Sequence, residues 1–241
     1  MNKRLLLLCL MFFYTLYTHG NQFILITTLY NEINQKRCEE YITCLEKNLA
    51  HPLIEKIHVV YDTSKDNEGD QILLNFLQTN EIEISYISGR ATYQNCFEIA
   101  NNLYPNRRVI VANGDIYFND TLKVLVSYNF ENKFLALTRW EINSDGSLRK
   151  QYGTHGRPLY CSQDAWIFCT PLRPFENADI QLGILGCDAT IAKQALLAGL
   201  QVLNPCLTVQ CVHLHFTNLR HYPTHGYPSE GYYEVKWDYL Y

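Results

Sequence analysis

The chain has 241 residues, of which 47% are hydrophobic and 18% are charged. This composition supplies enough apolar surface for one substantial core and excludes an intrinsically disordered protein. The formal net charge is -4, with acidic and basic residues interspersed, so the sequence lacks the basic surface by which proteins bind nucleic acid.

The first twenty residues have the pattern of a signal peptide. Lys3 and Arg4 precede an apolar run over residues 5–17, and the segment ends at Gly20. The run is shorter than the roughly 20 residues that span a bilayer. We therefore expect 1–20 to be a cleaved signal peptide that directs the protein to the secretory pathway, with a retained membrane anchor as the alternative. Any membrane association would come through this leader alone.

The remainder, residues 21–241, is expected to form one domain. Short apolar runs alternate with amphipathic stretches from Phe23 onward, which is typical of an α/β fold with a mostly parallel sheet flanked by helices. In its first half the sequence predicts strands and helices in alternation, over 23–30 (strand), 35–49 (helix), 56–62 (strand), 69–78 (helix), 82–87 (strand), 91–104 (helix) and 109–118 (strand).

The second half is less regular. The sequence predicts a short helix from Thr121, a polar loop over 147–162 and a tail without helical or strand period after Phe216. The remaining expected elements are a strand over 133–140, a strand over 164–168, a helix over 188–198 and two short strands around Val202 and Val212.

Eight cysteines follow the leader, and their spacing fits no zinc pattern. An even number permits disulfides in an oxidising compartment, and Cys206 and Cys211 are near enough in sequence to close a short loop. Cys96, Cys169 and Cys187 lie in apolar stretches, so we expect them to be small buried hydrophobic residues.

Polar residues follow four of the expected strands. They are residues 30–32, Asp62, residues 113–115 and the pair His213 and His215. Ligands of open α/β sheets bind at the carboxyl ends of the strands, so these are the first candidates for a site.

The motifs YNE at 30–32, VVYD at 59–62 and NGD at 113–115 resemble those of the GT-A glycosyltransferases, in particular the broad family-two-like group. The resemblance covers residues 23–216 in the order of elements. It implies a single GT-A domain that transfers a sugar from a nucleoside-diphosphate sugar, such as a UDP- or GDP-sugar, to a hydroxyl acceptor.

The same resemblance assigns roles to individual residues. It implies that Leu29, Asn31, Glu32 and Asp62 contact the base and ribose of the donor. The aspartate-any-aspartate motif of the family holds a divalent ion, and its last aspartate corresponds to Asp115.

The first position of that motif is Asn113, which offers only a neutral oxygen or a hydrogen bond near the nucleotide, so metal affinity should be lower. Mn²⁺ or Mg²⁺ bound to Asp115 would neutralise the charge of the diphosphate leaving group. The alternative is that residues 113–115 only form a turn.

His213 and His215 alternate along a strand and therefore face the same side of a sheet. Many GT-A enzymes are similar in placing a histidine late in the chain as a further metal ligand, and imidazole is a competent ligand of Mn²⁺. The alternative is a hydrogen-bonded pair of core histidines.

An inverting transferase needs a general base, and Asp188 before an apolar helical pattern is the candidate, with Asp164 as its substitute. Asp188 would otherwise be an ordinary helix N-cap. Trp140 and Trp166 are candidates for stacking on a sugar ring, or else core residues.

Two other classes of protein are compatible with parts of the sequence. One is a GT-A-fold sugar- or nucleotide-binding protein that lost turnover with the first motif aspartate. The other is a nucleotidyltransferase, which is disfavoured because no glycine-rich, lysine-containing phosphate loop follows the first strand. The glycosylation sequon at 119–121 is interpreted as chance, because a glycan there would obstruct a site at Asp115.

Overall fold

The computed structural model describes residues 22–65, 71–153, 156–217, 219, 231 and 233–240. The expected signal peptide lies outside the described residues and stays a prediction. Within the described ranges, none of the helices combines the length and the apolar character that a membrane span needs.

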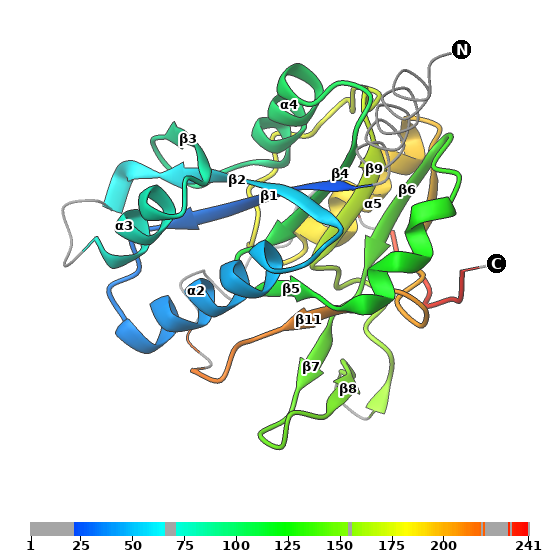
Figure 1. The fold of residues 1–241 in the computed structure, drawn as a ribbon. Helices are drawn as coiled ribbons and strands as arrows, with labels where there is room; N and C mark the ends of the chain where they lie inside the picture. Colours follow the sequence, from blue (N-terminus) through cyan, green and yellow to red (C-terminus); the bar gives the residue numbers. More distant parts are fainter. Residues whose placement is uncertain are drawn as a thin grey trace, which may run out of the picture.

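A seven-stranded, mostly parallel sheet lies at the centre of the protein (Figure 1). Its strand order is β10-β6-β9-β4-β1-β2-β3, and β9 runs antiparallel to both of its neighbours. The predicted α/β class with a mostly parallel sheet flanked by helices is confirmed. The strands are β1 (Phe23–Tyr30), β2 (Ile54–Asp62), β3 (Glu83–Ile87), β4 (Arg108–Asn113), β6 (Lys133–Leu137), β9 (Ala165–Cys169) and β10 (Gln201–Leu203).

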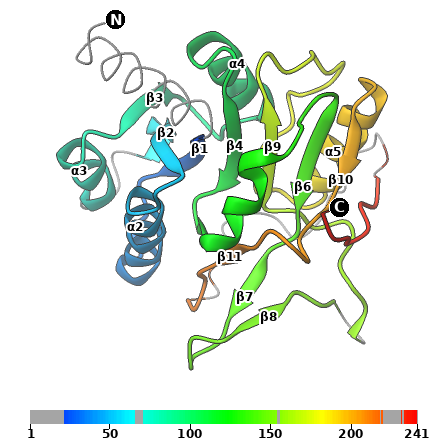
Figure 2. The same ribbon diagram turned by 45° about the vertical axis from the view of Figure 1, so that its right-hand side comes forward.

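Helices cover both faces of this sheet (Figure 2). The side chains of α2 (Gln35–Leu49) and α3 (Ile72–Thr79) pack on one face, and those of α4 (Tyr93–Leu103) and α5 (Cys187–Leu197) pack on the other. Strands that are covered on both faces read as continuous apolar runs, which explains the sequences of β1 and β4.

The direction of strand addition reverses at β1. The chain adds β2 and then β3 on one side of β1, and it returns with β4 on the other side. Ligands of open α/β sheets bind at the carboxyl ends of the strands at such a reversal. Tyr30 at the end of β1 and Asn113 at the end of β4 therefore mark the expected place of the site.

A second sheet of four strands lies against the carboxyl end of β4 (Figure 1). Its order is β5-β11-β7-β8, and β11 pairs with β5 in antiparallel and with β7 in parallel orientation. Through this pairing, His213 lies opposite Ile116 and Glu141. The strands are β5 (Ile116–Phe118), β7 (Trp140–Ile142), β8 (Leu148–Lys150) and β11 (Cys211–His213).

Several predicted boundaries are wrong, and two of the errors have the same cause. The single strand expected over 109–118 is β4 and β5, separated by a turn, and the strand expected over 133–140 is β6 and β7, which belong to different sheets. Apolar or aromatic residues lie on both sides of each break, so periodicity alone does not show it. The helix expected from Thr121 is a 3₁₀-helix over Asp120–Ser127, and β8 lies in the stretch predicted to be a loop.

The eight cysteines that the structure describes are all free. Cys206 and Cys211 form no disulfide, and both are buried. Cys96 and Cys187 are buried as expected, whereas Cys169 is half-buried.

Candidate functional site

A cavity of about 980 Å³ opens at the carboxyl ends of β1 and β4. This volume is at the upper end of the range that is typical of small-molecule sites. Its wall also includes residues from α2, α5, β11 and the segment between β8 and β9. Eight of the residues singled out from the sequence line it, namely Leu29, Asp62, Asn113, Asp115, Asp164, Asp188, His213 and His215.

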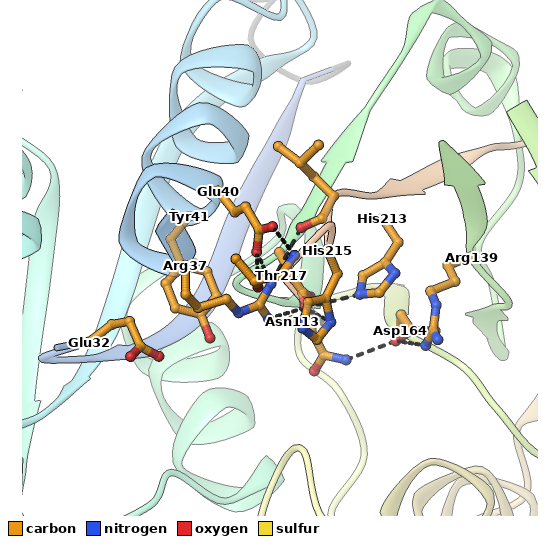
Figure 3. Close-up of polar contacts among 12 residues, drawn as sticks. Glu32, Arg37, Glu40, Tyr41, Asn113, Arg139, Asp164, His213, His215 and Thr217 are labelled. Atoms are coloured by element: carbon orange, nitrogen blue, oxygen red, sulfur yellow. Dashed lines mark hydrogen bonds and ion pairs between the residues drawn. The ribbon is translucent and has the colours of Figure 1, made fainter. Parts of the chain in front are cut away.

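Asp115 is the centre of a buried polar cluster. Its side chain lies in the turn between β4 and β5, and the residue is 8% exposed. Its Oδ2 atom accepts a hydrogen bond from Arg37 Nη2 at 2.5 Å, and it lies 3.1 Å from His213 Nε2 and 3.9 Å from His215 Nδ1. The Arg37 guanidinium approaches this atom from α2, and the two imidazoles approach it from the end of β11 and the segment that follows (Figure 3).

Gly114 allows this turn to pass close to β1. A Cβ atom at this position would lie 2.5 Å from Leu29 Cδ2 and 3.1 Å from the Thr28 carbonyl oxygen. The first of these contacts is too short for any real Cβ, so a larger residue would force the Leu29 side chain or the turn to shift. The glycine thus positions Asp115 at the edge of the sheet.

The two histidines differ in charge. His213 Nδ1 lies 3.0 Å from Glu141 Oε2, so both of its ring nitrogens face carboxylates. Burial acts to lower the pKa of His213, but Asp115 and Glu141 outweigh it and raise the pKa to about 9. Burial and the nearby Arg37 charge lower the pKa of His215 to about 4, so this imidazole is neutral at pH 7.

Asp115, His213 and His215 form a group whose ligand atoms all lie within 4.8 Å of one another. Two atoms bound to the same ion at about 2.1 Å are roughly 3 Å apart in the cis arrangement of an octahedron and about 4.2 Å apart in the trans arrangement. The distances of 3.1 and 3.9 Å from Asp115 Oδ2 to the imidazole nitrogens fall in this range. Glu141 on His213 Nδ1 would orient the ring with Nε2 toward the ion. The residues therefore fit a divalent metal ion.

Arg37, which the sequence analysis did not single out, ties this cluster to helix α2. Its side chain is buried, and its guanidinium donates to Glu40 Oε2 at 2.8 Å and to the Leu214 carbonyl oxygen at 3.4 Å. The guanidinium also lies over the ring of Tyr41, with Cζ 4.4 Å from the ring centroid. Glu40 in turn accepts from the backbone N–H and the hydroxyl of Thr217 (Figure 3).

A second polar cluster lies beside the first. Asp164 Oδ1 accepts from Asn113 Nδ2 at 3.1 Å and from Arg139 Nη1 at 2.9 Å. Figure 3 shows the contact of Arg139 with Asp164. Arg139 also donates to Glu141, so this cluster is linked to the partner of His213. The other oxygen of Asp164, Oδ2, is buried and has no hydrogen-bond partner among the described residues. Asn113 thus hydrogen-bonds to a carboxylate, which an aspartate in its place would repel.

Asp188 lies in the first turn of α5, in the wall of the same cavity. Its Oδ1 atom accepts a hydrogen bond from Cys187 Sγ at 3.0 Å and one from the Tyr93 hydroxyl at 3.5 Å. Burial and the Asp164 charge raise the pKa of Asp188 to about 7. The N-cap of α5 is Gly186, so Asp188 does not have the alternative role of an N-cap.

Of the residues that were expected to contact the base and ribose of the donor, some line the cavity and others do not. Asp62 lines the cavity and accepts from the backbone N–H groups of Ser64 and Gly89 at 2.9 and 2.8 Å. Asn31 and Glu32 are buried and are not in the cavity wall that the described residues form. Glu32 accepts from the Tyr30 hydroxyl and from a backbone N–H, which stabilises the loop after β1.

Two further cations line the cavity near Asp62, and the sequence analysis missed both. They are Lys65, whose Nζ lies 4.7 Å from the centroid of the Tyr30 ring, and Arg90, which donates to the Leu182 carbonyl oxygen at 3.1 Å. Neither belongs to a motif, and each follows a strand of the central sheet by only a few residues. That position is the signal by which they could have been found.

Neither of the two tryptophans proposed for sugar stacking, Trp140 and Trp166, is in the cavity wall that the described residues form. Trp166 is 0% exposed and packs edge-on against Tyr93, with ring centroids 4.8 Å apart, so it is a core residue and not a sugar-stacking one. Trp140 donates from Nε1 to the Cys206 carbonyl oxygen at 2.8 Å, and Lys150 lies over its ring.

No protein-family model matches the chain, and no curated protein matches its sequence. Similar solved structures include a TarS fragment from S. aureus, with 18% identity over 84% of this chain and a TM-score of 0.46. Another is 4-diphosphocytidyl-2C-methyl-D-erythritol synthase from Anaerococcus prevotii, with 16% identity over 83% of this chain, 93% of the other chain and a TM-score of 0.43.

A third similar structure is the mannosyltransferase PcManGT from Pyrobaculum calidifontis, in complex with GDP-Man and Mn²⁺. It shares 14% identity over 86% of this chain, with a TM-score of 0.49. The chain spans about three fifths of the TarS fragment and of PcManGT, at 60% and 58% of their lengths.

Proposed function

We propose that this protein is an inverting glycosyltransferase that moves a sugar from a nucleoside-diphosphate sugar to a hydroxyl acceptor. The observation that carries the proposal is the composition of one cavity wall. A group of residues that fits a divalent ion, Asp115 with His213 and His215, and an acid with a pKa of about 7, Asp188, line the same cavity at the strand-order reversal.

The transfer is a single displacement at the anomeric carbon of the donor sugar. The acceptor oxygen forms a bond to the anomeric carbon while the bond from that carbon to the diphosphate oxygen breaks, and its electron pair leaves with the diphosphate. The acceptor proton goes to the Asp188 carboxylate, and a pKa of about 7 suits a base that works near neutral pH.

A bound Mn²⁺ or Mg²⁺ would supply positive charge against the leaving diphosphate. Asp115 and the two histidines would hold it, and Glu141 would keep the His213 ring in place. In the same cavity wall, Asp62, Lys65 and Arg90 offer a carboxylate and two cations for the ribose hydroxyls and the phosphates of the donor.

A binding protein without turnover is the second candidate, because the Asn113 side chain is held by Asp164 and adds no anionic ligand to the metal group. The experiment is a panel of UDP- and GDP-sugars, with and without Mn²⁺, that records thermal stabilisation and release of the nucleoside diphosphate. The control is Asp188→Asn, which should keep the stabilisation and lose the release.

Stabilisation together with release supports the transferase. Stabilisation without release, with each of a range of hydroxyl acceptors, would replace it with the binding protein. Release of pyrophosphate from a nucleoside triphosphate and a sugar 1-phosphate would instead indicate a nucleotidyltransferase, and a protein that no nucleotide stabilises would refute all three.

A further inference from the structure

The carboxylate that a divalent ion would need is already paired with a cation of the chain itself. Arg37 Nη2 lies 2.5 Å from Asp115 Oδ2, and both residues are buried. An arginine guanidinium is charged throughout the physiological pH range, so Asp115 faces a permanent positive charge.

The guanidinium is fixed at this place by more than Asp115. Glu40 and the Leu214 carbonyl oxygen accept from Nη1, and the ring of Tyr41 lies against the flat face of the guanidinium. Its Nε–H group is buried and has no hydrogen-bond partner among the described residues, although the side chain lines the cavity and is part of a residue only 4% exposed. A buried, unpaired donor costs roughly 1–3 kcal/mol, so its presence points to a ligand acceptor.

We propose that Arg37 is the resident cation of the donor-phosphate site, where it competes with divalent ions for Asp115 and donates hydrogen bonds to the diphosphate. This inference rests on the proposed function for the identity of the ligand. The competition between Arg37 and the ion does not, because it concerns the Asp115 carboxylate alone.

The position of Arg37 affects both metal binding and diphosphate binding. A divalent ion that binds Asp115 Oδ2 must displace the guanidinium or lie within a few ångströms of its positive charge, and either event weakens metal binding. Without metal, the planar guanidinium with its free Nε–H provides the charge-assisted donors by which arginine binds phosphate oxygens. The site is thus built to bind a diphosphate before any metal arrives.

The test uses Arg37→Met, which preserves much of the length of the side chain and removes its charge. Mn²⁺ alone, titrated by electron paramagnetic resonance, should bind this variant at least 10-fold more tightly than it binds the wild type. UDP and GDP, titrated calorimetrically in EDTA, should bind at least 10-fold more weakly, and added Mn²⁺ should restore their affinity. Arg149→Met, which removes an exposed arginine of β8 outside the cavity wall, is the matched control and should change neither affinity.

The opposite signs of the two expected changes separate this role from simple damage to the fold, which would weaken both. Mn²⁺ affinity that is unchanged or weaker in folded Arg37→Met overturns the inference, whatever the outcome of the transfer assay. If that variant does not fold, Arg37→Gln decides. It removes the charge but keeps a polar amide that can donate to Asp115 or Glu40, so it should bind Mn²⁺ more tightly than the wild type, and unchanged affinity overturns the inference.

Discussion

Replacement of Asp115 by Asn tests the polar cluster at its centre. The substitution preserves the shape of the side chain and removes the charge that pairs with Arg37 at 2.5 Å and with His213 at 3.1 Å. Removing one partner of a buried ion pair costs roughly 3–5 kcal/mol, because the other charge stays buried. Glu40 still pairs with Arg37, and the Asn oxygen still accepts one hydrogen bond, so we expect the lower end of this range, about 3 kcal/mol.

The assay is urea denaturation of the wild type and of Asp115→Asn, followed by titration of Mn²⁺ into the folded proteins. The variant should lose most of its Mn²⁺ affinity, on the order of 100-fold, because an anionic ligand has become neutral. Asp145→Asn removes a carboxylate of an exposed turn and should stay within about 0.5 kcal/mol of the wild type. A folded Asp115→Asn protein that loses less than about 1 kcal/mol and binds Mn²⁺ like the wild type would refute both the ion-pair energetics and the metal assignment.

Three further outcomes are expected. Gly114→Ala should lower the free energy of unfolding by roughly 1–3 kcal/mol in urea, because its Cβ would lie 2.5 Å from Leu29 Cδ2, and an unchanged value would contradict the close approach. His213 has a pKa raised to about 9, so its contribution to stability is complete below the unfolded value of about 6.5 and is lost as the pH rises through 9; Asp115→Asn should flatten this part of a stability–pH curve. If Asp188 is the base, the rate of transfer should rise with pH around a midpoint of about 7, and a pH-independent rate between 5 and 9 would exclude it from that role.

The sequence predicted those parts of the fold and site that depend on local patterns. The strands and helices up to residue 113 follow from continuous apolar runs and amphipathic periods, and they are confirmed to within a few residues. The candidates Asp62, Asp115 and Asp188 were found because polar residues follow apolar strands or precede a helix, and all three line the cavity. Their roles in catalysis and binding stay predictions.

The remaining features depend on contacts between distant segments. Arg37 looks like an ordinary residue of an amphipathic helix, and only the folded chain places it against a carboxylate 78 positions later. Arg139 lies in the run over 133–140 that was predicted as one strand, and Glu141 lies just beyond its end. The break between β6 and β7 places them against Asp164 and His213. Trp166 was a stacking candidate because aromatic residues serve in both cores and binding sites, and nothing local distinguishes the two.

The contacts between α2 and the segment after β11 form late in the synthesis of the chain. Arg37 and Glu40 leave the ribosome early, but their partners Leu214 and Thr217 come 177 positions later. At a rate of synthesis of about 5–20 residues per second, the two sides of these contacts emerge roughly 10 to 35 s apart. The β1–α2–β2 unit can form during that interval, whereas the two charges must remain hydrated or paired elsewhere until the last strand arrives. Nascent chains stalled before residue 213 should therefore contain much of the central sheet, while the contacts of Arg37 and Glu40 with Leu214 and Thr217 are still absent.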